Sequence, residues 1–556
     1  KNINFLRGSG GAIIADGQCP FIISNCKFIN CSRGGLAGAI SAQAKYNSQI
    51  IDCTFKRCYA FGEMKTVRWE TSATMTSTAS SDGGAILISD LVTVKSCRFE
   101  DCSAGDGGAI NAYGKCQILD CVFVKNHAGR AECMQSYEHG GAIYLKGGSG
   151  ALVKGCTFNE NSAGRFGGAI SIYANDVRIE DCVFNSNYVD DSVKQKGGAI
   201  FISSDSKIGD TGIQITRCTF NNNGYNSNKH YCKYGGAIYF DEGIIVGHIS
   251  YCNFTANGAS KEGGAVYASS NCKSLNFKGC LFTKNQVKEY GGGIYLDSKS
   301  STIVDCAFVE QPNAIYCDHK GCSVKFSTFL RNDNYDVWST KEINIANNWF
   351  GNTMDNRYYD LAKLKGKAVN LNNRENLYLV ATSMDKNYHD GQESTIDLSM
   401  KYMRDSPTSD SKLPPFSNPA ISYGVSGVNV KVVSDKLYLA NGKSSFKFLA
   451  DPSKSTSSLT VDCYGAKLTL KLNLNPNSFA ALQAAIDSSQ SGVLNLTHDY
   501  SRDKSIDKDM SINILKNLVI NGNGHTVDSK SLGNVFKIKN SKVNLEINNL
   551  YKLRNK

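Results

Sequence analysis

The chain has 556 residues, with 61 basic and 50 acidic side chains and a formal net charge of +11. Its Lys and Arg residues are scattered rather than clustered, which argues against nucleic-acid binding. No apolar run approaches the roughly 18 residues that a membrane span needs. A chain of this length exceeds one ordinary core, so about two to four domains are expected.

Two short motifs alternate through the first part of the chain. The first is Gly-Gly-Ala-Ile, which starts at Gly10, Gly83, Gly107, Gly140, Gly167, Gly197 and Gly235, with variants at Ala37, Gly263, Gly291 and Pro312. The second is Cys-x-Phe, which starts at Cys26, Cys53, Cys97, Cys121, Cys156, Cys182, Cys218, Cys252, Cys280 and Cys306. Three residues after the Phe there is usually Asn or, in early copies, Cys. One unit of this repeat takes about 26 residues.

Each unit contains three short apolar stretches, for example 142–145, 151–153 and 156–158. Stretches of this length are typical of strands and too short for helices. Three brief strands per unit predict a right-handed parallel β-helix, in which equivalent residues of successive coils lie above one another. The Phe and Ile columns would then fill the interior. The paired Gly would permit positive φ or close backbone approach at one corner, and the Asn would form a hydrogen-bonded ladder at another.

The 21 cysteines follow this repeat. A cysteine in the Cys-x-Phe slot is predicted to point inward as a small apolar residue, so mostly free, buried thiols are expected. Disulfides between neighbouring coils remain an open alternative, because a coil spacing of roughly 4.8 Å lies within the Cα range of disulfides. An oxidising extracellular setting would favour them.

Extra residues enter mainly between the Asn or Cys corner and the following Gly-Gly-Ala-Ile. Insertions at one corner of stacked coils emerge on one side, so they predict a loop-built binding face. Aromatic residues with polar neighbours suit contacts with sugars or proteins. The alternative is that these are tolerated loops with packed aromatic side chains. The candidate binding residues are Arg68, Trp69, Glu70, Tyr137, His139, Tyr188, Asp190, Asp191, Tyr225, His230 and Tyr231.

The repeat fades after Asn332, so residues 1–355 are expected to form the β-helix and 356–375 a linker. Strand-like stretches separated by polar turns predict an immunoglobulin-like β-sandwich over 376–474. The first domain is expected to enter in mid-coil, without a cap of its own in this segment.

A third pattern begins at Ser478, where Phe479, Leu482 and Ile486 have helical spacing and strand-like segments follow. We expect 475–556 to be the N-terminal cap and first coils of a further β-helix. The chain is therefore expected to be a segment of a longer array of tandem modules, with its signal and anchor outside this segment.

The Gly-Gly-Ala-Ile and Phe-x-x-Asn repeats over roughly 1–335 resemble those of the chlamydial polymorphic membrane proteins. Together with NNWFGN at 347–352, the sandwich, AALQAAI at 480–486 and LVINGNGHTV at 518–527, they are similar to the adhesin-like surface proteins of methanogenic archaea along nearly the whole chain. The resemblance implies a secreted cell-surface protein that attaches to glycans or proteins of neighbouring cells, with no cofactor. A structural envelope component without a specific ligand is the main rival.

Catalysis is not expected from the residues. A polysaccharide lyase needs clustered carboxylates for calcium and a basic residue, and a hydrolase needs paired carboxylates across one groove. The coils carry few acidic residues at repeated positions. Cys317, His319 and Cys322 are three candidate zinc ligands, but their spacing is unorthodox and no fourth ligand is apparent, so no metal site is expected.

Overall fold

The computed structural model describes residues 1–554 apart from 9, 16–19, 44–45, 62–63, 70–71, 78–80, 130–137, 191–194, 204–211, 226–230, 242, 271, 358, 370–372, 384–392, 408, 410–412, 414–417, 435–436, 452–455, 474, 490, 504–506 and 508–510. The chain divides into two compact units. The first comprises Lys1–Phe350, Asp360–Asn376 and Ser417–Pro419, and the second comprises Gly351–Tyr359, Leu377–Phe416 and Ala420–Lys556.

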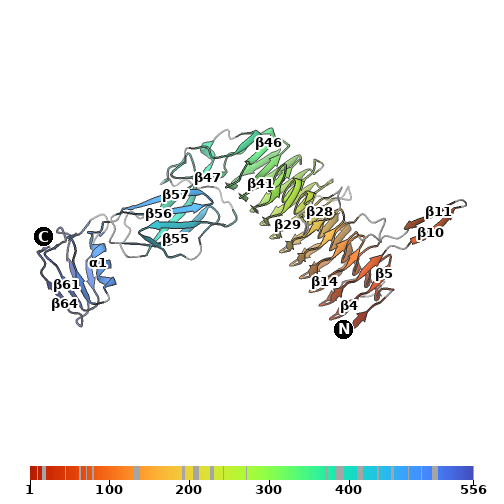
Figure 1. Ribbon diagram of the computed structural model, residues 1–556, viewed down its shortest axis with the longest axis horizontal. Helices are drawn as coiled ribbons and strands as arrows, with labels where there is room; N and C mark the ends of the chain where they lie inside the picture. The colour runs from red at the N-terminus through yellow and green to blue at the C-terminus, as the bar shows by residue number, and fades with distance from the viewer. Residues whose placement is uncertain are drawn as a thin grey trace. The chain divides into compact units, whose positions relative to one another are not determined.

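The first unit is a stack of coils built from three long parallel sheets (Figure 1). Sheet A carries the Cys-x-Phe strands: β1 (Asn4–Leu6), β4 (Lys27–Ile29), β8 (Thr54–Lys56), β14 (Arg98–Glu100), β18 (Val122–Val124), β22 (Thr157–Asn159), β26 (Val183–Asn185), β30 (Thr219–Asn221), β34 (Asn253–Thr255), β38 (Leu281–Thr283), β42 (Ala307–Val309), β45 (Thr328–Leu330) and β47 (Trp349–Thr353).

Sheet B carries the strands that begin at the Gly-Gly-Ala-Ile motif: β2 (Ile13–Ala15), β6 (Ile40–Ala42), β12 (Ile86–Ile88), β16 (Ile110–Tyr113), β20 (Ile143–Ser149), β24 (Ile170–Asn175), β28 (Ile200–Ile202), β32 (Ile238–Phe240), β36 (Val266–Ala268), β40 (Ile294–Leu296), β43 (Asn313–Cys317), β46 (Tyr335–Asn344) and β48 (Leu364–Val369).

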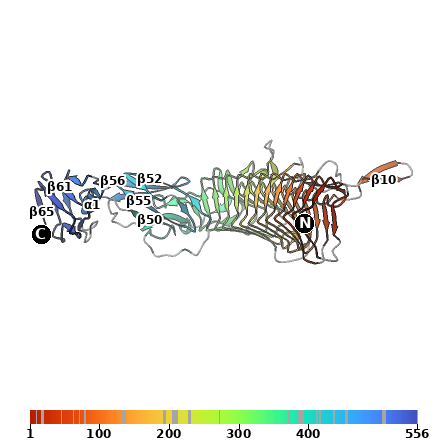
Figure 2. The ribbon, with the colours of Figure 1, turned by 90° about the horizontal axis from the view of Figure 1, so that it is seen from below.

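Sheet C lies between them along the chain: β3 (Ile22–Ser24), β7 (Ser48–Ile51), β13 (Val92–Lys95), β17 (Gln117–Leu119), β21 (Leu152–Lys154), β25 (Arg178–Glu180), β29 (Ile213–Thr216), β33 (Val246–Ser250), β37 (Ser274–Lys278), β41 (Ser300–Val304) and β44 (Cys322–Lys325). The strands of successive coils lie side by side throughout (Figure 2).

The phenylalanines of sheet A form one interior column. From Phe5 to Phe329, neighbouring rings stack with centroids 4.7–5.2 Å apart. Most of them, from Phe28 to Phe308, are fully buried. The strand register places each Phe directly on the Phe of the next coil, as for Phe123 and Phe158. Burying one aromatic ring per coil is the main apolar contribution to the stack.

Each coil turns at residues with positive φ. At the corner after sheet A this residue is not glycine, as in Asp101 (φ 53°) and Lys125 (φ 54°). Before sheet B it is the first Gly of the motif, for example Gly83 (φ 69°). Glycine is needed there because a Cβ would also meet the carbonyl of Ile86 in the same coil.

The described cysteines are free, buried thiols, as expected for the Cys-x-Phe slot. Their sulfur atoms satisfy backbone groups at the corner between sheets C and A. The Cys97 thiol donates to the Lys95 carbonyl at 3.2 Å and accepts the backbone N–H of Cys53, in the preceding coil, at 3.4 Å. A thiol at this corner therefore accepts a backbone N–H from the preceding coil, as the Asn side chain does at the corner after sheet A.

The predicted linker 356–375 contains a strand. Strand β48 pairs in parallel with β46, with Val337 opposite Leu364 and Ile343 opposite Ala368. The stretch does not carry the repeat motif, but apolar Leu364 and Ala368 pack on the interior cluster of the coils. Trp349, at the start of β47, is fully buried.

The second unit contains antiparallel sheets where a β-sandwich was predicted. One sheet has the order β49 (Leu377–Ser383), β50 (Ser394–Tyr402), β55 (Lys443–Ala450) and β53 (Val430–Val432). A second has the order β52 (Gly424–Val428), β56 (Thr456–Cys463) and β57 (Ala466–Asn473), and a pair joins β51 (Ile421–Ser422) and β54 (Tyr438–Leu439). The immunoglobulin-like assignment of these sheets remains a prediction.

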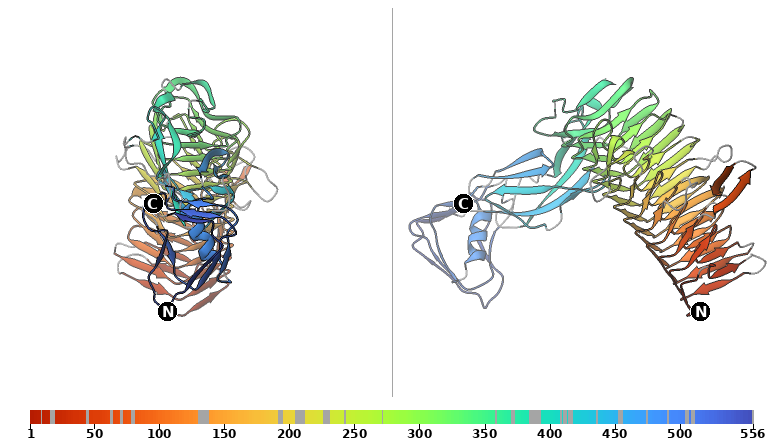
Figure 3. Two further views of the ribbon diagram at one scale, coloured as in Figure 1. Left: turned by 90° about the vertical axis from the view of Figure 1, so that its left-hand side faces the viewer. Right: turned by 45° about the vertical axis from the view of Figure 1, so that its right-hand side comes forward.

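The predicted capped start of another β-helix follows. Helix α1 (Phe479–Ser488) is the blue helix in Figure 3. Ser478 is its N-cap, and the Ser478 side chain accepts the Ala481 N–H. Three parallel sheets come next: β58 (Val493–Asn495), β61 (Leu518–Asn521) and β64 (Leu545–Asn548); β59 (Tyr500–Ser501), β62 (Thr526–Asp528) and β65 (Lys552–Arg554); β60 (Ile512–Ile514) and β63 (Phe536–Ile538). Among the described residues, no helix is both long and apolar enough to cross a membrane.

Candidate functional site

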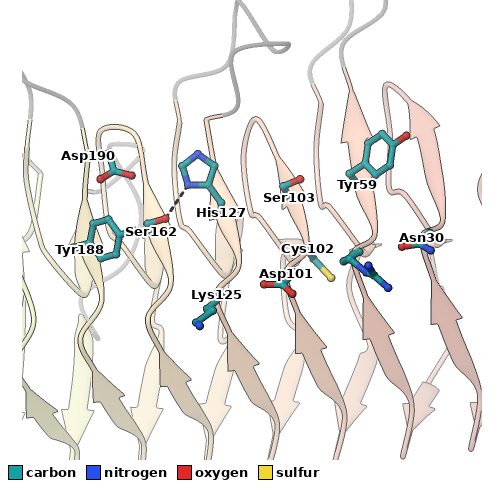
Figure 4. Close-up of a pocket in the computed structure, with 11 residues that line it drawn as sticks. Asn30, Tyr59, Asp101, Cys102, Ser103, Lys125, His127, Ser162, Tyr188 and Asp190 are labelled. Carbon is teal, nitrogen blue, oxygen red and sulfur yellow. Dashed lines mark hydrogen bonds between the residues drawn. The ribbon is translucent and has the colours of Figure 1, made fainter. Parts of the chain in front are cut away.

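A groove of about 700 Å³ runs along the first unit where the coils leave sheet A (Figure 4). The residues that line it come from several successive coils: Asn30, Arg57, Tyr59, Asp101, Cys102, Ser103, Lys125, His127, Ser162, Tyr188 and Asp190. Polar and aromatic side chains predominate, and both signs of charge are present.

The floor of the groove is a fourth parallel sheet, sheet D. It consists of β5 (Ser32–Gly34), β9 (Tyr59–Phe61), β15 (Ser103–Ala104), β19 (His127–Ala128), β23 (Ser162–Ala163) and β27 (Tyr188–Val189). The first residue of each strand is paired with the first residue of the next. This register runs from Ser32 to Tyr188. The five of its residues that line the groove are Tyr59, Ser103, His127, Ser162 and Tyr188, which we call the groove column.

The groove column has an aromatic ring at each end and hydroxyl or imidazole groups between them. Four coil steps separate Tyr59 from Tyr188, or about 19 Å at a strand spacing of about 4.8 Å. Ser103 and Ser162 are 5% and 6% exposed, whereas the three ring side chains are half-buried. Rings that are partly open, with polar groups between them, suit an elongated polar ligand that lies parallel to the column.

The second glycine of each Gly-Gly-Ala-Ile motif holds the groove column in place. A Cβ on Gly84 would lie 2.6 Å from the backbone nitrogen and oxygen of Ser103, and one on Gly108 would lie 2.6 Å from the carbonyl of His127. Since any side chain at these positions would push sheet D outward, the motif and the groove depend on the same close packing.

Charged residues of the positive-φ corner form one wall. Arg57, Asp101 and Lys125 come from three successive coils and are exposed. Lys125 forms an exposed ion pair with Glu160 at 3.6 Å. This wall carries two cations and one anion, and Asp190 adds an anion at the far end. The groove is thus close to neutral and does not select strongly for one sign of charge.

Partial burial changes the acidity of two groups at the Tyr188 end. Desolvation raises the pKa of Asp190 above its ordinary value, and desolvation also raises the pKa of the Tyr188 phenol. Asp190 and Asp101 lie three coil steps apart, or about 14 Å. Two carboxylates that act across one glycosidic bond are about 5–9.5 Å apart, so these two do not form such a pair.

The structure brings two of the predicted binding residues, Tyr188 and Asp190, to this groove. Arg68 and Trp69 lie on β10 (Met64–Trp69), which pairs with β11 (Ser72–Ser77) in an antiparallel hairpin that leaves the coils. Tyr225 and Tyr231 contact each other, with ring centroids 5.4 Å apart, and the Tyr225 hydroxyl donates to Asn222 at 3.0 Å. Glu70, Tyr137, Asp191 and His230 lie outside the described residues.

His139 does not lie on an accessible loop face. It is 4% exposed on the outer side of sheet B, where its Nε2 is 3.2 Å from the Tyr173 hydroxyl and its ring contacts Tyr144 and Phe166. Desolvation lowers its pKa to about 3, so the imidazole is neutral. The insertion that precedes His139 led to the prediction of a loop position. His139 is, however, the residue immediately before Gly140-Gly141, and it packs between coils.

Sequence reasoning missed most of the groove. Nine of the eleven lining residues were not among the candidates: Asn30, Arg57, Tyr59, Asp101, Cys102, Ser103, Lys125, His127 and Ser162. A signal was present: each groove-column residue directly follows the Asn or Cys corner of its repeat, as Ser162 follows Asn161. In the described part of the chain, no group of three or more His, Cys, Asp or Glu side chains is arranged to hold a metal ion.

Comparison with known proteins identifies the family of the chain. The family model of the right-handed β-helix region matches residues 1–138, 79–246 and 141–350, which together span more than half of the chain. The chain therefore belongs to the right-handed β-helix family, as the fold predicted from the sequence requires. A search of curated proteins finds no match.

Several solved structures are similar to the chain. A tailspike protein mutant of E. coli bacteriophage HK620 in complex with a hexasaccharide is 10% identical, with a TM-score of 0.32, over 84% of this chain and 86% of that one. The tailspike protein gp49 of Acinetobacter baumannii bacteriophage Fri1, a capsular polysaccharide depolymerase, is 9% identical, with a TM-score of 0.21, over 80% of this chain and 73% of that one. Both TM-scores lie below 0.5, so the fold assignment rests on the parallel sheets and on the family model.

One expectation from the sequence is corrected by this comparison. No enzymatic activity was expected, but the similar structures include a protein that degrades capsular polysaccharide. The small number of acidic residues at repeated positions is therefore not a sufficient ground for excluding catalysis from a chain of this fold.

Proposed function

We propose that the chain is a surface-displayed glycan-binding protein whose groove holds a linear oligosaccharide parallel to the stack of coils. The groove column carries this proposal, because it places two tyrosines about 19 Å apart with three hydrogen-bonding side chains between them. Tyrosine offers a sugar an apolar ring and a polar hydroxyl. The polysaccharide complexes of similar folds are in keeping with a ligand of this class.

The finer assignment is an adhesin. As an adhesin, the chain would be extracellular and attached to the cell surface. Its ligand would be a glycan of a neighbouring cell, or a protein that carries such a glycan. The resemblance of the repeats and of the cap to adhesin-like surface proteins of methanogenic archaea supports this part of the proposal. A stiff solenoid of stacked coils also suits a protein that presents a site away from a surface.

Binding of the full-length chain to a glycan array tests the proposal. We expect wild-type protein to bind a subset of linear glycans, and Tyr59→Ala and Tyr188→Ala to lower the affinity about five- to tenfold each, through loss of ring contact. Tyr46→Ala is the matched control, because Tyr46 is 54% exposed and does not line the groove. Binding that is unchanged in both groove variants would contradict the proposal.

A further inference from the structure

His127 and Ser162 form a hydrogen-bonded pair in the middle of the groove. The Nδ1 atom of His127 lies 2.8 Å from the Oγ atom of Ser162 (Figure 4). The two residues belong to adjacent coils and are register partners in sheet D. Both side chains line the groove, so a bound ligand can reach them.

The backbone holds this pair rigidly. The His127 N–H donates to the Cys102 carbonyl at 2.9 Å, and the Ser162 N–H donates to the Asn126 carbonyl at 2.9 Å. Gly141 packs against the backbone of Ser162, as Gly108 packs against that of His127. A pair fixed by strand register and close packing keeps its geometry without help from the ligand.

The groove column allows a direct comparison of Ser162 with a second serine beside His127. His127 has Ser103 on one side and Ser162 on the other, both as register partners. The two serines are almost equally buried, at 5% and 6%. The hydroxyl of Ser162 is hydrogen-bonded to the imidazole, with 2.8 Å between Oγ and Nδ1.

A serine hydroxyl that is hydrogen-bonded to an imidazole is the arrangement of an activated nucleophile, because the imidazole removes the proton as the oxygen attacks. Tyr188, the register partner of Ser162 in the next coil, supplies a second hydroxyl. Since desolvation raises its pKa, Tyr188 remains a phenol at neutral pH and can donate a hydrogen bond to a developing oxyanion.

We propose that Ser162 and His127 hydrolyse acyl esters carried by the glycan in the groove. The Oγ atom of Ser162 forms a bond to the acyl carbon while its proton passes to Nδ1 of His127. The ester bond to the sugar then breaks, and the sugar hydroxyl leaves with that proton. Water attacks the acyl-serine, gives a proton to His127 and releases the carboxylic acid, and Ser162 regains its proton. The substrate class rests on the proposed glycan-binding function, but the ester chemistry does not.

The experiment compares four full-length proteins: wild type, Ser162→Ala, His127→Gln and the control Ser24→Ala, which changes a serine that is 8% exposed and does not line the groove. Each is assayed with p-nitrophenyl acetate and with a chemically O-acetylated oligosaccharide that binds the wild type. We expect hydrolysis to fall at least 100-fold in Ser162→Ala and His127→Gln and to stay within twofold in Ser24→Ala. A fluorophosphonate probe should label Ser162 in wild type and in Ser24→Ala, which mass spectrometry of the peptides can locate.

Hydrolysis by wild type that is no faster than by Ser162→Ala would overturn the inference, and so would probe labelling at another residue or equal losses in Ser24→Ala and Ser162→Ala. Binding of the de-acetylated oligosaccharide separates this inference from the proposed function. Binding without hydrolysis overturns the esterase alone. Hydrolysis of p-nitrophenyl acetate at Ser162 without any glycan binding supports the esterase and overturns the proposed function.

Discussion

The side-chain carbonyl of Asn161 accepts two hydrogen bonds from Asn126 in the preceding coil. One comes from the backbone N–H at 3.0 Å and the other from the side-chain amide at 2.9 Å. Both residues are fully buried. The amide of Asn161 in turn donates to Oδ1 of Asn187 at 3.0 Å, and the same contact repeats up to Asn285. These bonds join successive coils at the edge of the groove.

Asn161→Ala should destabilise the first unit by about 2–4 kcal/mol, because it leaves two buried donors of Asn126 without an acceptor. Urea unfolding and amide hydrogen exchange at Asn126 measure the effect. Asn159→Ala is the matched control: its Oδ1 accepts from Asn185 at 2.9 Å on the half-buried outer face, where water can replace it, so we expect a loss below about 1 kcal/mol. Equal losses in the two variants would contradict the role of the ladder.

Gly84→Val should disrupt its coil and loosen the adjacent groove strand. Its Cβ would overlap the carbonyl of Gly108 and lie 2.6 Å from backbone atoms of Ser103, and none of these backbone atoms can move without breaking sheet pairing. Limited proteolysis and thermal melting should both show an earlier transition. Gly10→Val is the control: unlike Gly83, Gly10 does not have a positive φ, and a Cβ there meets no atom within 4 Å, so both profiles should stay unchanged. A native-like Gly84→Val protein would refute the close-packing explanation.

The coils could be predicted from the sequence because Phe and Asn recur in fixed positions with one role each. The groove was missed because its column has Tyr, Ser and His at equivalent positions, which share no chemistry; only their position after the Asn or Cys corner marks them. Because of the insertion after Tyr59, its register partner Ser103 lies 44 positions further along the chain. Strand β48 was missed for a different reason: Leu364 and Ala368 pack on the coils without either motif.

The stability of the first unit should depend on pH through Asp106. This residue is 7% exposed, and its Oδ1 accepts the His139 N–H at 2.9 Å. Desolvation, with a smaller contribution from the charge of Asp82, raises its pKa to about 7. Between about pH 4 and pH 7 the folded chain therefore holds a proton that the unfolded chain has released, so this contribution to stability falls as pH rises, by up to about 1.4 kcal/mol per unit.

Asp106→Asn removes this titration and retains an acceptor for the His139 N–H. The variant and wild type should be similarly stable near pH 4, and the variant should become progressively more stable than wild type up to about pH 7. His139 contributes with the opposite sign, because burial lowers its pKa to about 3, but it does so in both proteins. A stability difference that stays constant from pH 4 to pH 8 would contradict the assignment.

The thiols of the Cys-x-Phe column should remain unpaired in air. Neighbouring Phe rings of the same strands are 4.7–4.9 Å apart between Phe28 and Phe308, which sets the spacing of the adjacent cysteines. The Cβ atoms of a disulfide lie only about 3.8 Å apart. Non-reducing mass spectrometry should find no link within the column, and these thiols should react with a thiol reagent only after unfolding. Cross-linked neighbouring coils in the native protein would disprove this.

The most direct test of glycan binding in the groove is amide hydrogen exchange with and without a glycan that binds the full-length chain. The proposed function predicts slower exchange in the strands of sheet D from β9 to β27 and at the corner residues Arg57, Asp101 and Lys125. Protection confined to the outer face of sheet B or to the second unit, with sheet D unchanged, would contradict it.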